Sequence, residues 1–172
     1  MNNAYGDGSV IKNRRGRRYA VNFSGKHRIT GAKRHLLICG NSHPLSFRVT
    51  RAKRHDQREL VALIDRCTID GRIRRPKRCG WDKGYDADPL RLALRKRHIV
   101  PCIPTRDNRV KPSILTKREC REQKYCRQRW KVERGFAWIN CSRRINQMHE
   151  RTLGQYHAFL TIACIRHYLA YF

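Results

Sequence analysis

Two patterns of hydrophobic and polar positions alternate along this 172-residue chain. Short apolar runs bounded by turn residues predict strands, whereas apolar residues three and four positions apart predict helices. Strands are predicted at residues 3–12, 35–39, 45–50 and 99–103, with a further strand that ends near residue 82. Helices are predicted at residues 54–66, 119–142 and 156–171, with a further helix that begins at residue 88. This order includes a hairpin around residues 40–44 and predicts one α/β domain over residues 1–172, a mixed sheet with helices on its faces.

The charge of the chain is far from balanced. Forty Lys and Arg residues face 13 Asp and Glu residues, which gives a formal net charge of +27, whereas small soluble domains carry a magnitude of about 2–8. An anionic partner is therefore expected; a nucleic-acid backbone is the first candidate, and an acidic membrane surface is the alternative. The basic segments 13–34 and 71–78 are predicted to be loops that follow such a backbone, although solvated arginines would give the same pattern.

No segment predicts a membrane span or a secretion signal. A span needs roughly 20 uninterrupted apolar residues, and the most apolar stretch, 158–172, is interrupted by Arg166 and His167. The polar start lacks a basic segment followed by an apolar one. We therefore expect a soluble cytoplasmic protein, associated with the nucleoid and not with a membrane. Its eight cysteines should stay reduced and mostly fill the core; because none are spaced as C-x-x-C, a zinc site would need distant Cys and His residues.

Acidic residues are scarce, so the setting of each one is informative. Most are expected to serve the structure, as exposed partners of Arg and Lys on helix faces, as a helix cap, or at helix ends and in loops. The residues expected on helix faces are Glu59, Glu119, Glu122 and Glu150. Asp88 is the expected cap, and the residues expected at helix ends and in loops are Asp65, Asp70 and Asp107. Three others, Asp7, Asp82 and Glu133, have settings that indicate chemistry.

Asp82 is expected where a strand ends, with Gly84 in the turn behind it. Ligands of open α/β folds bind at the carboxyl ends of strands, although a structural turn aspartate would look the same. Asp7 is followed by glycine, which is first of all a turn signal. Asp82 therefore predicts a carboxylate at the sheet edge, whereas the local pattern around Asp7 is by itself a weak signal, and neither position assigns a reaction.

Glu133 lies within a predicted helix, where most residues three and four positions away are apolar. It is therefore expected on an inward face, where a carboxylate needs a cation, either a metal ion or Arg129 one turn earlier. The nearby aromatic residues Trp130, Phe136 and Trp138 are expected in the core rather than as platforms for bases. Carboxylates from two strands and a helix can hold two divalent cations, which activate a water or a 3′-hydroxyl in phosphoryl transfer.

Two segments are especially specific: Asp-Lys-Gly-Tyr-Asp at 82–86 and Arg-Trp-Lys-Val-Glu-Arg-Gly-Phe-Ala-Trp at 129–138. Together with residues 31–36, 44–45, 54–56, 143–145 and 157–164, they resemble the DDE transposases of bacterial insertion sequences, in the group named after insertion sequence five. The resemblance runs from about residue 7 to residue 170, essentially the whole chain.

The resemblance implies an RNase H-like catalytic domain that cuts and rejoins double-stranded DNA with two Mg²⁺ ions, which Mn²⁺ can replace. Asp7, Asp82 and Glu133 correspond to the catalytic Asp, Asp and Glu that ligate these metal ions. Arg129 corresponds to an arginine that holds a phosphate. The further DNA-binding residues are expected to be Lys83, Arg134, Arg143 and Arg144.

The sequence departs from the family pattern at several positions. The family's helix Tyr and Lys are Cys126 and Asn140 here, Cys39 stands where Asp is usual, and Ser42-His43 replaces a glycine and an apolar residue. Trp81 precedes Asp82 where a small residue is usual, and is expected to crowd the site.

The chain begins six residues before Asp7. The first strand is therefore expected to be truncated, and the family's N-terminal helix-turn-helix region to come from an upstream reading frame or a fusion partner. The domain is expected to act as a homo-oligomer on paired DNA ends. Two alternatives stay open: an inactive, truncated remnant that only binds DNA through its charge, and a basic ribosome-associated protein.

Overall fold

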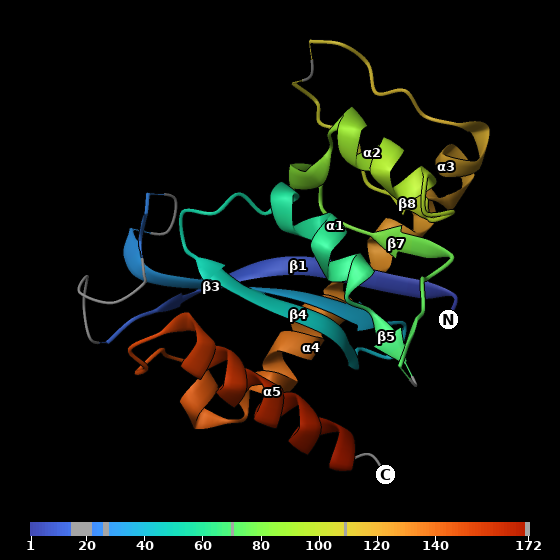
Figure 1. Cartoon of the computed structure of the whole chain (residues 1–172). Helices are drawn as coiled ribbons and strands as arrows, with labels where there is room; N and C mark the ends of the chain where they lie inside the picture. The colour runs from blue at the N-terminus through green and yellow to red at the C-terminus, as the bar shows by residue number, and fades with distance from the viewer. Residues whose placement is uncertain (15–21, 26–27, 70, 109, 171–172) are drawn as a thin grey trace.

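The computed structural model describes residues 1–14, 22–25, 28–69, 71–108 and 110–170. In this part of the chain, a six-stranded mixed sheet lies between two layers of helices (Figure 1). Its strands are β1 (Asn3–Lys12), β2 (Asn22–Ser24), β3 (Ile29–Cys39), β4 (Pro44–Arg51), β7 (Arg78–Gly80) and β8 (Val100–Cys102). The short strands β5 (Thr68–Ile69) and β6 (Arg72–Ile73) pair separately.

Strand β1 lies at the centre of the sheet. It pairs antiparallel with β3 on one side and parallel with β7 on the other, and β8 continues in parallel beyond β7. The other edge of β3 pairs antiparallel with β2 and β4. One half of the sheet is therefore antiparallel and the other parallel, which confirms the predicted mixed α/β architecture.

The helices divide between the two faces. Helices α1 (Gln57–Asp65) and α2 (Asp88–Arg95) cover one face, and α4 (Trp130–Asn140) and α5 (Leu153–Leu169) cover the other (Figure 1). Helix α3 (Lys117–Glu122) lies beside β8. The 3₁₀ segments are η1 (Lys83–Tyr85), η2 (Gln123–Arg129) and η3 (Arg143–Ile145). No helix within the described residues is long and apolar enough to cross a membrane.

Side chains that alternate along β3 divide the core in two. Leu36 and Ile38 join the cluster beneath α4 and α5, whereas Leu37 joins the cluster beneath α1 and α2. All eight cysteines are free thiols. Four of them, Cys67, Cys79, Cys102 and Cys164, are buried as expected, whereas Cys120 and Cys141 are exposed.

Part of the segment predicted as a loop is strand. Strands β2 and the first half of β3 fall within residues 13–33, because β3 pairs with β1 as far as Gly31 opposite Lys12. Pairing with a distant segment overrides the weak local preference of a basic, glycine-containing stretch. Residues 15–21 and 26–27 of this segment, and Asp70, lie outside the described residues.

The long helix predicted at 119–142 is interrupted. Residues 123–129 form η2 between α3 and α4. Within η2, the Cys126 thiol donates to the carbonyl of Cys102 (2.7 Å), and Gln128 Oε1 accepts from the Tyr5 hydroxyl (2.9 Å). These contacts hold η2 against β8 and β1, so tertiary packing competes here with regular helix formation.

The starts of the helices follow their caps. Helix α5 begins at Leu153 instead of residue 156, because Thr152 forms a capping box with Gln155. Helix α2 has Ala87 as its N-cap, so the prediction that Asp88 is the cap is wrong. Asp88 lies in the first helical turn instead, where its negative charge still faces the positive end of the helix dipole.

Three acidic residues expected on exposed helix faces are buried: Glu59, Glu119 and Glu150 are 1, 1 and 5% exposed. The expectation is wrong for them because each carboxylate is held by an arginine. The partners are Arg54 (2.7 Å), Arg95 (2.5 Å) and Arg144 (2.8 Å), respectively. A buried carboxylate is tolerated when it is paired and hydrogen-bonded.

Candidate active site

Asp7 and Asp82 stand side by side because β1 and β7 are parallel neighbours. The register sets Tyr5 opposite Gly80. Asp7 lies two residues after Tyr5 on β1, so its side chain points to the same face as Tyr5, toward α4. Asp82 lies two residues after Gly80, where the backbone is still extended (φ −76°, ψ 168°). The structure thus brings together the two strand carboxylates that the sequence singled out.

Glu133 joins them through Arg129. Arg129 Nη1 lies 2.6 Å from Asp7 Oδ2, and Nη2 lies 3.4 Å from Glu133 Oε1. The Glu133 side chain is 64% exposed, so the prediction of an inward-facing carboxylate is wrong. The buried stripe of α4 carries Val132 and Ile139 instead. The ion pair with Arg129, considered as the alternative, is present, but it is exposed rather than buried.

A cleft of about 320 Å³ opens over these residues. Its charged lining consists of Asp7, Asp82, Glu133 and Arg129, together with Lys33 and Asp56. Sequence reasoning assigned no role to the last two, although both lie in segments that carry the family resemblance. Among the described residues, four of the chain's 13 acidic side chains therefore line one cleft with two cations, a formal charge of −2 in a chain of +27.

The electrostatics of Asp7 reflect this crowding. Burial raises the pKa of Asp7 above its ordinary value, and the negative charges of Asp82 and Asp56 raise it further. The backbone amide of Gly8, 2.8 Å from Asp7 Oδ1, and the guanidinium of Arg129 both act to lower that pKa. The carboxylate is therefore in a setting where an additional cation would be stabilising.

The donor set fits a divalent cation. Carboxylate oxygens suit Mg²⁺ and Mn²⁺, and the buried Asp82 Oδ1 accepts no hydrogen bond from the described residues. Gly84 leaves room beside it, since a Cβ there would lie 2.8 Å from this oxygen. Among the described residues, no three His, Cys, Asp or Glu side chains converge into a metal-binding group. Arg129 is the cation that neutralises Asp7 and Glu133 in this structure.

The other predicted DNA-binding residues lie outside the cleft lining. Arg143 and Arg144 are exposed in η3, and Lys83 is exposed in η1. Arg134 donates a hydrogen bond to the Ser42 hydroxyl (2.9 Å). None of these four cations is among the described residues that line the cleft.

The aromatic residues of α4 differ in their settings. Phe136 packs against the core as expected. Trp130 is 51% exposed, so the core prediction is wrong for this residue. The guanidinium of Arg134 lies 5.0 and 4.9 Å from the ring centroids of Trp130 and Trp138, which accounts for the exposed indole by cation–π contact.

Trp81 does not crowd the cleft. It is fully buried on the opposite face of the sheet, beneath α1 and α2. Its ring fills the space above Gly6, where a Cβ would come within 2.1 Å of the ring. Because neighbouring residues of an extended chain point to opposite faces, Trp81 enters the core while Asp82 reaches the cleft.

The other departures from the family pattern lie away from the cleft lining. Cys39 and His43 close the β3–β4 turn through a backbone hydrogen bond of 2.9 Å, and Ser42 adopts a φ of 72° within that turn. Cys126 bonds to β8, as described, and the Asn140 side chain accepts from Arg34 (2.8 Å). Cys126 and Asn140 therefore have structural partners in place of the roles that Tyr and Lys have in the family.

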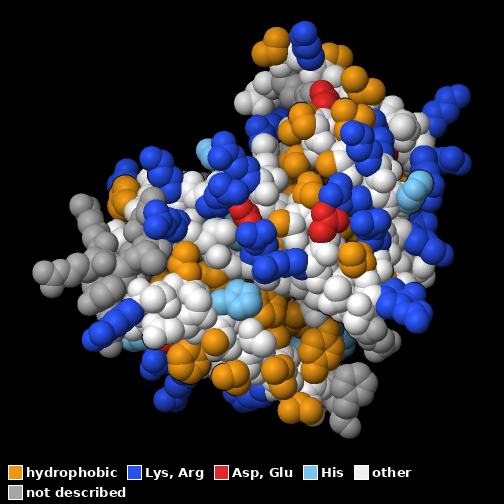
Figure 2. All heavy atoms as spheres, in the orientation of Figure 1, with side chains coloured by type: hydrophobic (Ala, Val, Ile, Leu, Met, Phe, Trp, Pro, Cys, Tyr) orange, Lys and Arg blue, Asp and Glu red, His pale blue; other side chains and the backbone are white. Residues whose placement is uncertain are grey.

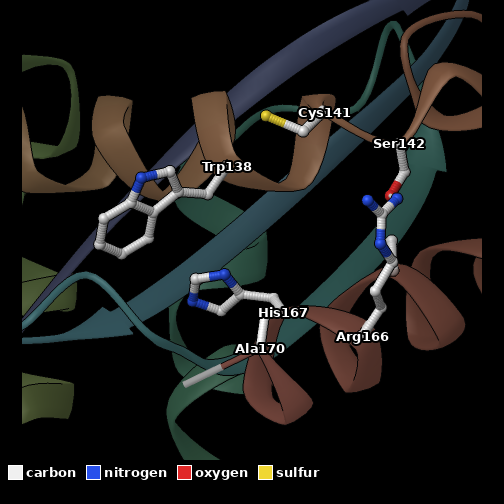
Figure 3. A pocket seen from close by; sticks show the side chains of 7 residues that line it. Trp138, Cys141, Ser142, Arg166, His167 and Ala170 are labelled. Atoms are coloured by element: carbon white, nitrogen blue, oxygen red, sulfur yellow. Dashed lines mark hydrogen bonds between the residues drawn. The ribbon is translucent and has the colours of Figure 1, made fainter.

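A second hollow, between the ends of α4 and α5, has a different chemistry (Figure 3). Its volume is about 180 Å³, and Trp138, Cys141, Arg166 and His167 are among the residues that line it. The rings of Trp138 and His167 stack there at 4.9 Å. None of the described residues lining it is acidic, so the carboxylate cleft is the candidate active site.

The order and directions of the strands, with helices on both faces, define an RNase H-like fold. The chain superposes on a chain of a piggyBac transposase synaptic complex with hairpin DNA over 99% of its length, with a TM-score of 0.56 and 10% identity. It superposes on a chain of a simian T-cell lymphotropic virus intasome complex with PP2A regulatory subunit B56 gamma over 95%, with a TM-score of 0.53 and 14% identity. It covers 47 and 46% of those chains.

Sequence comparison is more specific than the fold. The model of the Transposase DDE domain family matches residues 7–169, and the chain belongs to this family. A protein assigned as the transposase of insertion sequence element IS402 from Burkholderia cepacia is 34% identical over 139 residues, which is 78% of this chain. The chain spans 61% of the length of that relative.

Proposed function

We propose that this chain is the catalytic domain of a DNA transposase. It cleaves phosphodiester bonds at the ends of a mobile element and transfers the resulting 3′-hydroxyl to target DNA. Asp7, Asp82 and Glu133 hold two Mg²⁺ ions, which Mn²⁺ can replace. The observation that supports this proposal is the gathering of four carboxylates and only two cations among the described residues of one cleft, in a chain of +27.

Each residue of the site has a distinct task in this proposal. Divalent cations supply activation of the attacking hydroxyl and stabilisation of the leaving oxygen in phosphoryl transfer. Asp7 and Asp82 form the rigid part of their site, because their spacing follows from the pairing of β1 with β7. Glu133 is exposed on α4 and completes the carboxylate set from the helix side. Arg129 donates hydrogen bonds to a phosphate once its carboxylate partners hold a cation instead.

The partner in this proposal is double-stranded DNA. Lysine and arginine side chains are spread over the face seen in Figure 2, with few acidic side chains among them. We assign further DNA-backbone contacts to Lys83, Arg134, Arg143 and Arg144, which lie outside the described cleft lining. Two element ends require two active sites, so we propose a homo-oligomer on DNA and a location at the nucleoid.

A nicking assay on supercoiled plasmid tests the proposal. We expect strand cleavage that depends on Mg²⁺ or Mn²⁺, and a loss of at least about 100-fold in Asp82→Asn and Glu133→Gln, since metal-ion catalysis is worth several kcal/mol. Asp65→Asn is the matched control, because Asp65 lies at the far end of α1 and pairs with Arg97. It should cleave like the unchanged chain.

Two results would contradict the proposal. Cleavage that persists in Asp82→Asn and Glu133→Gln would exclude these carboxylates as the catalytic set. DNA binding without any metal-dependent cleavage would instead favour a non-catalytic, DNA-binding remnant.

A further inference from the structure

Two of the segments that resemble the family each contribute a residue to the cleft, and the proposed function gives neither residue a role. Residues 31–36 belong to β3, and residues 54–56 precede α1. Pairing of β3 with β4, which sets Lys33 opposite Thr50, brings these segments together. As a result Lys33 and Asp56 line the same cleft as the three proposed catalytic residues.

Lys33 is held at the wall of the cleft by two contacts. Its Nζ donates to the carbonyl of Arg54 (2.9 Å) and lies 3.0 Å from Asp56 Oδ1. The side chain is 11% exposed, so its position is well defined by packing. The contact with the Arg54 carbonyl is a hydrogen bond, whereas the contact with Asp56 is an ion pair, because Asp56 Oδ1 accepts no hydrogen bond from the described residues. An ammonium group has three N–H donors, so within the described part of the chain N–H groups remain for a group that enters the cleft.

Asp56 is itself fixed from two sides. Its Oδ1 would lie 2.6 Å from a Cβ at position 8, so Gly8 allows β1 to approach this carboxylate. The buried ring of His35 lies behind it, with Nδ1 3.6 Å from Asp56 Oδ1 and Nε2 2.8 Å from Thr50 Oγ1. Burial lowers the pKa of His35 to about 4. The ring is therefore neutral near pH 7 and does not compete with Lys33 for the carboxylate.

We propose that Lys33 is a further DNA-contacting residue of the cleft, whose ammonium binds a non-bridging oxygen of a backbone phosphate, and that Asp56 is its positioning residue. This inference rests on the proposed function, since it takes the cleft to be where a DNA strand binds. Arg129 and Lys33 are the two cations among the described lining residues. A strand in the cleft is therefore held by both while the carboxylates act between them.

The setting of the pair differs from that of a structural ion pair in the same chain. Arg91 and Asp86 form a closed pair, with side chains 1 and 0% exposed and an N–O distance of 2.9 Å. In contrast, the side chain of Asp56 is 40% exposed and the pair opens into the cleft. A compact ammonium group with a donor to spare is a common phosphate ligand.

The experiment measures the affinity of the chain for duplex DNA at several salt concentrations. Ca²⁺ is present in place of Mg²⁺, because both cations take oxygen ligands. In Lys33→Gln we expect the slope of log K against log salt to fall by about 1, the loss of one phosphate contact. Lys96→Gln is the matched control and should keep the slope, since Lys96 is an exposed lysine at the C-terminal end of α2. In Mg²⁺, Lys33→Gln should raise the KM of cleavage about tenfold or more, and Lys33→Arg should restore much of it.

Asp56→Asn retains the ammonium but loosens it, so a smaller rise in KM is expected. Thermal melting verifies that each variant folds; Lys33→Met, of similar length and without charge, replaces Lys33→Gln if the latter unfolds. Unchanged salt slope and KM in the Lys33 variants would overturn the inference while metal-dependent, Asp82-dependent cleavage upholds the proposed function. A Lys33-dependent slope without any cleavage would uphold the DNA contact and contradict the proposed function.

Discussion

The guanidinium of Arg129 is shared between two carboxylates of the site. It lies 2.6 Å from Asp7 and 3.4 Å from Glu133, and its side chain is 30% exposed. Such a pair contributes little to stability in water, about 1 kcal/mol or less. The pair matters because Arg129 contacts carboxylate oxygens that a bound metal cation would also need, so the cation and Arg129 compete for the same oxygens.

Replacing Arg129 should therefore make the site more responsive to metal. In Arg129→Ala we expect the melting temperature to fall slightly without metal, because Asp7 and Glu133 lose their counter-charge. Added Mg²⁺ should then raise the melting temperature more than it does in the unchanged chain, because no guanidinium has to be displaced.

Differential scanning fluorimetry across a Mg²⁺ titration measures both effects. Arg121→Ala removes an exposed arginine of α3 and is the control for net charge. An equal Mg²⁺ response in the two variants would show that Arg129 does not compete with the cation.

At the scale of elements, the two faces of strand β1 have different neighbours. Asp7 faces the cleft, whereas Gly6 meets the ring of Trp81 on the other face. The parallel register with β7 then fixes Asp82 beside Asp7. Because Gly6 has no side chain, β1 accommodates the large indole of Trp81, which directly precedes Asp82, while the neighbouring Asp7 lines the cleft.

This packing makes Gly6 sensitive to substitution. Gly6→Ala inserts a Cβ within 2.1 Å of the Trp81 ring, and overpacking of this kind costs about 1–3 kcal/mol. Urea unfolding should show that loss of stability. Gly40→Ala is the matched control, since no atom lies within 4 Å of its added Cβ, and its stability should stay within about 0.5 kcal/mol. Equal stability of the two variants would contradict the packing described for Trp81.

At the scale of the whole molecule, the net charge and the described lining of the cleft have opposite signs. The chain carries +27, while the described lining residues carry a formal charge of −2. In the proposed function, the basic surface attracts DNA, and the carboxylates repel its phosphates until cations neutralise them. Apolar side chains also gather over α5 in Figure 2, where Ile162, Ile165 and Leu169 are 61, 53 and 74% exposed.

Binding and cleavage should therefore respond differently to conditions. Affinity for nonspecific duplex should fall about 10³-fold or more between 50 and 200 mM salt, as for proteins that make six to ten phosphate contacts. Asp82→Asn should retain this binding and its salt dependence, because it leaves the basic surface intact. Fluorescence anisotropy with a labelled duplex measures this; weak dependence on salt would contradict binding through the basic surface.

The fold was largely predictable, and the exceptions share a cause. Periodicity predicted the mixed sheet and its helices, but not that β3 begins at Ile29, nor that η2 interrupts the long helix. Both depend on pairing and packing with segments far away in the sequence. The buried Glu59, Glu119 and Glu150 were missed because their arginine partners, 5, 24 and 6 residues away, do not follow the three- and four-residue spacing of a helix face.

The sequence alone determined the class of protein, since the scarcity of acids in a basic chain and the segments at 82–86 and 129–138 are local features. Tertiary structure decided how these residues are arranged. Strand register set Asp7 beside Asp82, the orientation of α4 turned Glu133 toward the cleft instead of the core, and the β3–β4 pairing brought Lys33 to Asp56. A one-dimensional pattern specifies residue type and face, but charge pairing across a cleft depends on distances that only the folded sheet fixes.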